Sequence, residues 1–247
     1  MADTPPPLQV VGVPVLADNY AWLIYDTKVQ EAAVVDPGEA APVLAAAKER
    51  GWTIAQVLLT HWHPDHTGGV AEMKKAGATI VGPRAEADRI PGLDVFLKPG
   101  DVVRVGNHTG KVLGVPGHTQ GHLAFHFSDD ATLFSGDTLF AMGCGRLFEG
   151  TPADMWGNMD RYAAMPPETK VYCGHEYTAG NARFAAHVDP DNAAVAARRT
   201  EVERQRANDE PTVPFTIGEE RETNPFMRAG SAERLGELRR QKDDFRG

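Results

Sequence analysis

Residues 57–69, with the sequence VLLTHWHPDHTGG, place four possible metal ligands directly after an apolar, strand-like run: His61, His63, Asp65 and His66. Imidazole and carboxylate groups are the usual ligands of zinc and related divalent ions, and they must converge within about 2 Å of the ion. Side chains two positions apart on an extended segment point the same way, so His61 and His63 can bind one ion together. Asp65 and His66 follow a turn at Pro64 and are predicted to bind a different ion.

The same residue types recur after three other apolar runs, each time beside a glycine: His118, Asp137 and His175. Together with the first segment they make five histidines and two aspartates, a set that suits two ions sharing one carboxylate. The sequence therefore predicts a first ion held by His61, His63 and His118. It predicts a second held by Asp65, His66 and His175, with Asp137 between the two.

The remaining histidines are interpreted as surface, strand or hydrogen-bonded residues: His108, His122, His126 and His187. Two of them, His122 and His126, are alternatively donors of hydrogen bonds to the ligands. Cys173 also ends a strand-like run, but a small buried thiol is the favoured role for it. No serine–histidine–aspartate arrangement or activated cysteine competes with the metal chemistry.

Short apolar runs separated by glycine, proline and aspartate turns predict many β-strands. They cover residues 8–16, 20–26, 31–38, 53–60, 78–82, 94–101, 102–106, 111–117, 122–128, 131–137 and 169–174. Helical patterns occupy residues 39–51, 70–77 and 151–166, with Gly51 as a C-terminal cap and Thr151 and Pro152 at a helix start. Mixed short strands with intervening helices indicate two sheets packed face to face and flanked by helices.

The composition of the chain changes after Gly174. Residues 181–211 and 231–245 are charged and helical, whereas residues 212–228 between them look irregular. We therefore expect a larger domain over residues 1–174 and a smaller helical domain over residues 175–247.

The totals describe a folded, acidic protein of 247 residues, with 42% hydrophobic and 24% charged residues. No apolar run approaches the length of about 20 residues needed to cross a bilayer. The first nine residues lack the charged start and apolar stretch of a secretory signal, and two cysteines make no disulfide framework, so the cytoplasm is the expected location. A net charge of -9 argues against nucleic acid as a partner.

Several stretches together resemble the metallo-β-lactamase superfamily, and within it the hydroxyacylglutathione hydrolase (glyoxalase II) family. THWHPDH with the later GHT, GDT and GHEY carries the superfamily resemblance, while GCGRLFEG, CGHEYT, NPFMR and the basic C-terminal helix are particular to the family. The resemblance implies an α/β fold, a four-layered α/β/β/α sandwich followed by a smaller helical domain that binds glutathione.

The resemblance also implies a reaction, the hydrolysis of S-(2-hydroxyacyl)glutathione thioesters. The main substrate would be S-D-lactoylglutathione, split to glutathione and D-lactate in the second step of methylglyoxal removal. Two ions can lower the pKa of a bridging water from about 15.7 toward neutrality, so that hydroxide attacks the thioester. Asp137 would bridge the ions, and Asp65 would bind one ion and orient the hydroxide.

The family places glutathione against Arg146, Phe148, His175, Tyr177, Arg239 and Lys242. Cations around the site would attract the carboxylates of glutathione, although a solvated helix face is the simpler interpretation of Arg239 and Lys242 from the residues alone. The family often has tyrosine where this chain has Phe148, so a hydroxyl that binds glutathione is missing here.

Other interpretations stay open. A glutathione persulfide dioxygenase with one iron belongs to the same superfamily, as do lactamases and nucleases, and a silent metal-binding protein is the non-enzyme alternative. The ligand set accepts zinc, the favoured metal, and also iron or manganese. The family precedent favours a monomer with a small-molecule substrate and no membrane partner.

Overall fold

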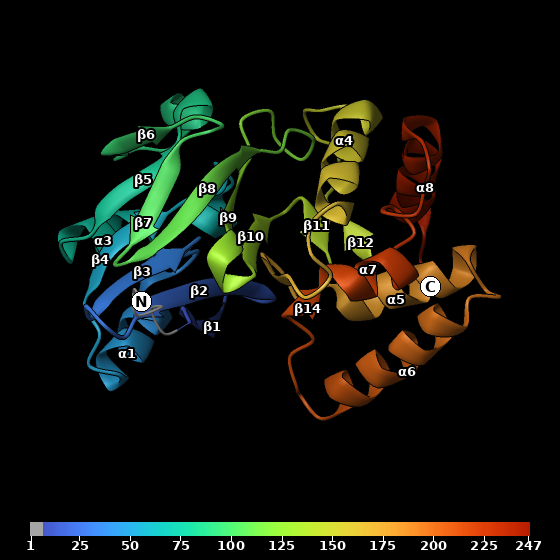
Figure 1. Cartoon of the computed structure of the whole chain (residues 1–247), viewed down its shortest axis with the longest axis horizontal. Helices are drawn as coiled ribbons and strands as arrows, with labels where there is room; N and C mark the ends of the chain where they lie inside the picture. The colour runs from blue at the N-terminus through green and yellow to red at the C-terminus, as the bar shows by residue number, and fades with distance from the viewer. Residues whose placement is uncertain (1–6) are drawn as a thin grey trace, which may run out of the picture. The chain divides into compact units, whose positions relative to one another are not determined.

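A computed structural model describes residues 7–247 (Figure 1). The chain forms two compact units. The first unit runs to Gly114 and includes Gly121–Gly136, and the second unit contains Val115–Gln120 and Asp137–Gly247. The stretch of residues 1–9 that predicts no secretory signal lies largely outside the described residues.

The first unit contains a six-stranded sheet with the order β1-β2-β3-β4-β5-β6. β1 to β3 pair antiparallel, and β3 to β6 pair parallel. The strands are β1 (Gln9–Val15), β2 (Asn19–Asp26), β3 (Glu31–Val35), β4 (Ile54–Leu58), β5 (Thr79–Pro83) and β6 (Val95–Leu97).

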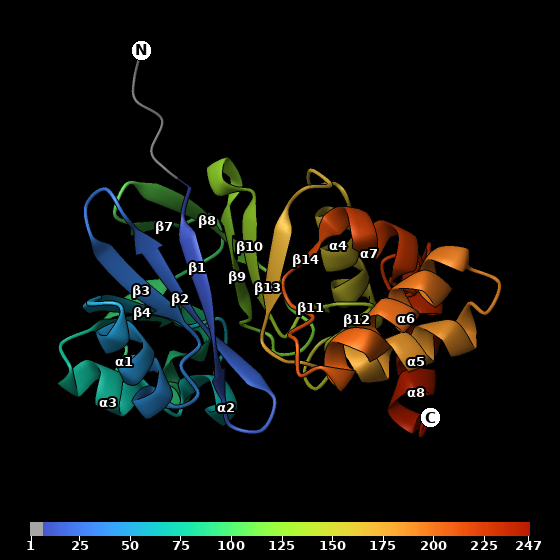
Figure 2. The same cartoon turned by 90° about the horizontal axis from the view of Figure 1, so that it is seen from below.

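Four further strands of this unit run in the order β10-β9-β8-β7 with antiparallel pairing. They are β7 (Val102–Val105), β8 (His108–Gly114), β9 (Leu123–Phe127) and β10 (Thr132–Gly136). Figure 2 shows β7 and β8 on one side of the first sheet, with α1 (Ala40–Glu49) and α3 (Val70–Lys75) on the other. Val43 of α1 and Met73 of α3 are fully buried against that sheet, so this unit is helix on sheet on sheet.

The parallel part of the first sheet explains where polar residues gather. Because parallel strands end at the same edge, the residues that follow β3, β4 and β5 come close together in space. Val35 pairs with Leu58, and Asp36 N donates to Leu58 O, so the chain leaves β3 and β4 side by side. Short α2 (Pro64–Thr67) and the 3₁₀ turns η1 (Arg84–Arg89) and η2 (Ser128–Asp130) complete the unit.

The second unit is mainly helical. Its strands pair as β11 (Leu139–Phe140) with β12 (Gly143–Cys144) and as β13 (Lys170–Cys173) with β14 (Phe215–Thr216). Its helices are α4 (Pro152–Ala163), α5 (Thr178–Val188), α6 (Ala193–Ala207), α7 (Ile217–Thr223) and α8 (Ala232–Asp244).

Local signals set several helix ends as predicted. Thr151 caps α4 in a capping box with Asp154, and Pro152 occupies the first helical position. Gly51 adopts a left-handed φ of +70° directly after the end of α1, which glycine tolerates without strain.

Two predictions from the C-terminal part need correction. Residues 212–228 are not irregular throughout, because they contain β14 and all of α7, which Thr216 caps in a second capping box with Glu219. Residues 181–211 are not one helical stretch, since α5 ends at Val188 before Pro190 and α6 starts anew at Ala193. Within residues 7–247, no helix is long and apolar enough to cross a membrane.

Candidate metal centre

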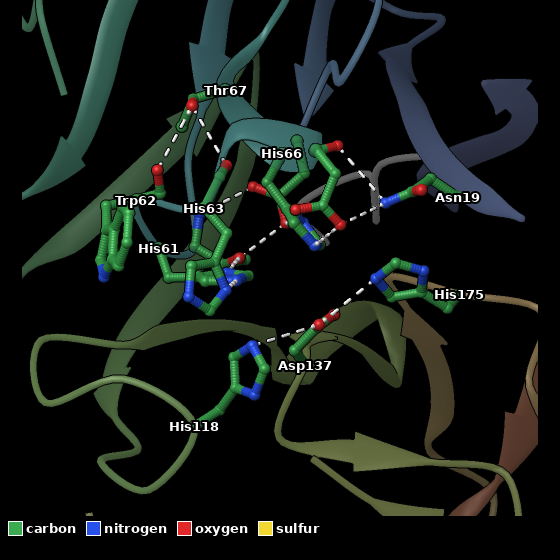
Figure 3. Close-up of polar contacts among 12 residues, drawn as sticks. Asn19, His61, Trp62, His63, His66, Thr67, His118, Asp137 and His175 are labelled. Atoms are coloured by element: carbon green, nitrogen blue, oxygen red, sulfur yellow. Dashed lines mark hydrogen bonds and ion pairs between the residues drawn. The ribbon is translucent and has the colours of Figure 1, made fainter. Parts of the chain in front are cut away.

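In the first unit the structure positions four predicted ligands where β4 ends. His61 is fully buried, His66 is nearly so, and Pro64 begins the single turn of α2 that carries Asp65 and His66 (Figure 3). This turn packs closely on the loop after β3, because a Cβ on Gly38 would lie 2.1 Å from Asp65 O. Glycine is therefore required at position 38.

Asp36 organises this part of the site, and the ligand prediction missed it. Its carboxylate accepts hydrogen bonds from Thr60 N at 2.8 Å and Thr60 Oγ1 at 2.6 Å. Its Oδ2 also lies 3.0 Å from His66 Nδ1. Because an ionised carboxylate only accepts, His66 Nδ1 carries the proton and Nε2 keeps the lone pair for a metal. Asp36 follows the strand-like run EAAVV as Asp137 follows ATLFSG, a signal that could have revealed it.

Asn19 performs a similar role for Asp65. Its Nδ2 donates to Asp65 Oδ2 at 2.9 Å and to Asp65 O at 3.3 Å, from a buried position at the start of β2. His61 is oriented by its neighbour, since its Nδ1 lies 2.9 Å from Thr60 Oγ1. Buried His122 stacks on His61 with ring centroids 4.5 Å apart, so it packs against a predicted ligand.

The distances between ligand atoms provide a test of whether these residues fit a metal. In a tetrahedral site with bonds of about 2.0–2.1 Å, two ligand atoms lie about 3.3 Å apart. His61 Nε2 and His63 Nδ1 are 3.0 Å apart, and His66 Nε2 and Asp65 Oδ2 are 3.4 Å apart. The second distance is longer than a charge-assisted hydrogen bond of about 2.7–2.9 Å. Both pairs fit the spacing of ligands on a common ion.

The second unit contributes the other three predicted ligands, and they converge on one carboxylate. Asp137 Oδ2 lies 3.4 Å from His118 Nε2 and 3.3 Å from His175 Nε2, as the dashed lines in Figure 3 mark. His118 Nδ1 lies 3.0 Å from Arg146 O and donates to it, which leaves Nε2 for a metal. One oxygen of Asp137 therefore has ligand spacing to two histidines, as expected of a shared carboxylate.

Cys173, two positions before His175, is a buried thiol. It is 1% exposed, and its Sγ donates to His175 O. Burial raises the pKa of the thiol, which disfavours the thiolate that a metal would need. Burial also raises the pKa of Cys144 to about 11.

Cations gather around α8 in the second unit. Arg239 is only 6% exposed, so the simple interpretation as a solvated helix face is wrong for this residue. It donates to Cys144 O at 2.7 Å and to Asp243 Oδ1 at 3.0 Å. Exposed Arg146 lies 3.7 Å from the same carboxylate oxygen. Asp243 therefore gathers two guanidinium groups.

Lys242 belongs to the same group. Its Nζ donates to Gly180 O at 2.9 Å and lies 5.5 Å from the ring centre of Phe184. Burial, together with the nearby charges of Arg239, Arg183 and Arg146, lowers the pKa of Lys242 to about 8, although the charge of Asp243 opposes the change.

Two aromatic side chains lie beside predicted metal ligands of this unit. Tyr177 stacks on His175 with ring centroids 4.5 Å apart and remains 40% exposed. Phe148 contacts His118 edge-on at 5.2 Å and is 62% exposed. Both rings are available to a ligand that approaches these histidines.

Comparison with known families covers almost the whole chain. Residues 17–175 match the family described as "Metallo-beta-lactamase superfamily", which agrees with the sheets, helices and histidine motif described above. Residues 176–245 match "Hydroxyacylglutathione hydrolase C-terminus". The fold and the site thus define a member of the metallo-β-lactamase superfamily, and the predicted fold class is confirmed.

Similar proteins identify the family of this chain within the superfamily. A "Hydroxyacylglutathione hydrolase" of Methylococcus capsulatus is 50% identical over 97% of this chain and 100% of its own length, and one of Cereibacter sphaeroides is 49% identical with the same coverage. The chain belongs to the hydroxyacylglutathione hydrolase family.

Solved structures share the fold. That of ETHE1 from Myxococcus xanthus is 25% identical, with a TM-score of 0.72 over 94% of this chain and 89% of that one. TTHA1623 "in a di-iron-bound form" is 26% identical, with a TM-score of 0.60 over 91% of this chain and 100% of that one.

Proposed function

We propose that this enzyme hydrolyses S-(2-hydroxyacyl)glutathione, chiefly S-D-lactoylglutathione, to glutathione and a 2-hydroxy acid such as D-lactate. This is the second step of methylglyoxal detoxification. The observation that carries the proposal is the family membership, at 44–50% identity over nearly the full chain, with the helical C-terminal region included.

We further propose that seven side chains hold two divalent ions. His61, His63 and His118 would bind one, Asp65, His66 and His175 the other, and Asp137 both. The ligand spacing within each unit supports this assignment, as does the di-iron form of a structural relative. Zinc is the proposed metal, with iron or manganese as alternatives that the mixed imidazole and carboxylate set also accepts.

Bound divalent ions supply Lewis acidity and lower the pKa of water toward neutrality. Hydrolysis then adds hydroxide to the thioester carbonyl carbon and breaks the C–S bond. The leaving thiolate belongs to a thiol with a pKa of about 8.5, so its departure needs little proton donation. Asp65, oriented by Asn19, would direct the attacking hydroxide, and no protein nucleophile is required.

Glutathione would lie against Arg146, Phe148, His175, Tyr177, Arg239 and Lys242. The cations around α8 complement the carboxylates of glutathione, and Tyr177 and Phe148 offer exposed rings beside two ligand histidines. Residues 1–174 would form the catalytic domain and residues 175–247 the glutathione-binding domain. The two family matches, which meet between residues 175 and 176, support this division.

The proposed setting is the cytoplasm, where the chain would act as a monomer on a small molecule, without a nucleic-acid or membrane partner. A net charge of -9 and two cysteines that form no disulfide support this setting.

A substrate comparison tests the proposed activity. The purified chain, loaded separately with zinc, iron or manganese, should consume S-D-lactoylglutathione with release of free thiol. Oxygen uptake with glutathione persulfide and no thioester cleavage would instead establish the dioxygenase alternative.

A further inference from the structure

A short buried hairpin connects two parts of the proposed site. Strands β11 and β12 form it over residues 139–144, between Asp137 and Arg146. At its tip Met142 has a φ of +55°, a left-handed conformation that non-glycine residues rarely adopt. Such a conformation persists only when the surroundings hold it.

Two polar residues of α7 and the segment after it hold this tip. Glu220 Oε2 accepts from Met142 N at 2.8 Å and from Asn224 Nδ2 at 2.7 Å. Asn224 Nδ2 also donates to Gly143 O at 3.0 Å and to Phe140 O at 3.3 Å. Both residues are at most 1% exposed, so water does not compete for these hydrogen bonds.

The NPFMR stretch gains a physical explanation from these contacts. Asn224 Oδ1 accepts from Phe226 N at 2.9 Å and from Met227 N at 3.3 Å, which folds the chain around the asparagine. Its amide group is thereby fixed in the orientation that faces the hairpin. Aspartate at this position would lose every donor.

Other helices hold the rest of the hairpin. Asn181 of α5 donates to Ala141 O at 3.0 Å, and Arg239 of α8 donates to Cys144 O at 2.7 Å. Each of the five residues 140–144 therefore has a backbone group bound by a buried polar side chain. Burying this many polar groups costs desolvation free energy that a purely apolar core would not incur. The directional hydrogen bonds that offset this cost fix the backbone of residues 140–144 in one conformation.

The hairpin is tied directly to the proposed ligands. Gly145 N donates to Thr138 O at 3.1 Å, and a Cβ on Gly145 would lie 1.9 Å from Asp137 O. Arg146 O accepts from His118 Nδ1. A shift of the hairpin would therefore move the carboxylate of Asp137 and release the ring of His118.

We propose that Glu220 and Asn224 are positioning residues of this hydrolase, which fix Asp137 and His118 through the hairpin of residues 139–144. The effect on turnover rests on the proposed function, whereas the effects on the hairpin and on metal binding do not. Glu220 acts through its acceptor oxygen Oε2 and not through a negative charge.

The environment of Glu220 agrees with that role. Burial raises the pKa of Glu220 to about 8, although the bonds from Asn224 and Met142 and the charge of Arg198 oppose the rise, and Glu219 adds to it. The side chain is therefore largely a neutral acid at pH 7. Glutamine, which retains one acceptor oxygen, should replace it.

The test compares Glu220→Ala, Glu220→Gln and Glu222→Ala in the full-length, metal-loaded chain. Glu222 lies on the same helix and is exposed, so it serves as the matched control. Each variant is measured for metal content per chain, for kcat and KM with S-D-lactoylglutathione, and for hydrogen exchange of the Met142 amide.

We expect Glu220→Ala to lower kcat or metal affinity about 10- to 100-fold, as loss of a residue supporting a metal ligand does. Met142 exchange should accelerate, while KM stays near the wild-type value. Glu220→Gln should restore kcat, metal content and slow exchange, and Glu222→Ala should change none of these.

A folded Glu220→Ala variant with fast Met142 exchange but normal kcat and metal content would overturn the proposal, as would a Gln variant that behaves like Ala. If Glu220→Ala does not fold, Glu220→Asp takes its place. If the Ala, Gln and Asp variants of Glu220 all fail to fold, Glu220 contributes to stability alone and the proposal is overturned. A wild-type chain that binds metal without cleaving the thioester would refute the proposed function, and metal content with Met142 exchange would still decide the role of Glu220.

Discussion

The two units arrange their proposed metal ligands in different ways. In the first unit four proposed ligands lie within six consecutive positions, at the end of a strand and in one turn of helix. In the second unit His118, Asp137 and His175 come from separate stretches of chain, and the hydrogen bond from His118 Nδ1 to Arg146 O orients one of them. We call the first set the compact half of the proposed ligands and the second set the dispersed half. Local chain geometry orients the compact half with support from Asp36 and Asn19, whereas we propose that the dispersed half depends on the hairpin of residues 139–144.

The largest effect should come from the dispersed half. Asp137→Ala removes one carboxylate with ligand spacing to two histidines, so both ions should lose a ligand. A loss of about 4 kcal/mol of transition-state stabilisation corresponds to a rate decrease of about a thousandfold. Steady-state kinetics with elemental analysis should show turnover and metal content falling together. Asp160→Ala, an exposed change in α4, is the control, and near-normal turnover in Asp137→Ala would remove the shared-carboxylate assignment.

The compact half should be weakened less, and through a residue that is not a ligand. Asp36→Ala removes the acceptor that orients His66, and loss of such a partner costs about 10- to 100-fold in metal affinity or activity. Competition with a chelator measures the affinity, and Asp88→Asn at an exposed position provides the control. Unchanged affinity in Asp36→Ala would show that α2 alone orients the imidazole.

The same comparison shows which features can be predicted from the sequence. The motif around His61 can be predicted because its spacing is local, and the strands and capped helices follow from local signals such as Thr151 and Gly51. The roles of Asn19 and Arg146 O cannot, because each depends on a hydrogen bond between residues far apart in sequence. The capping box of Thr216 with Glu219 is also a local signal, and it predicts the start of α7 within a stretch that otherwise looks irregular.

Substrate binding in the second unit should respond to pH through Lys242. Its pKa of about 8 means that the ammonium is present at pH 7 and is lost as pH rises through 8. Loss of one charge-assisted contact to a glutathione carboxylate should raise KM about tenfold between pH 7 and 9.5. The Lys242→Arg variant keeps its positive charge over this range. Because the amine of the substrate titrates equally in both experiments, the KM of the variant should rise less than that of the wild type. Identical KM profiles for the two proteins would contradict a role for Lys242 in binding.

The smallest effect should come from the exposed ring beside His118. Phe148→Tyr restores the hydroxyl that the family often has, and one hydrogen bond of about 0.5–1.5 kcal/mol should lower KM about 2- to 10-fold with kcat unchanged. Initial-rate measurements over a range of substrate concentrations separate the two constants. An unchanged KM would mean that glutathione makes no polar contact at this position.

The central claim, that the seven proposed ligands hold two metal ions, is tested most directly by metal titration of the apoprotein. Thioester hydrolysis and bound metal are measured together as zinc is added in small steps. Activity should reach its plateau at two ions per chain, and Asp137→Ala should not reach it at any ratio. Full activity at one ion per chain, or activity independent of metal, would contradict the claim.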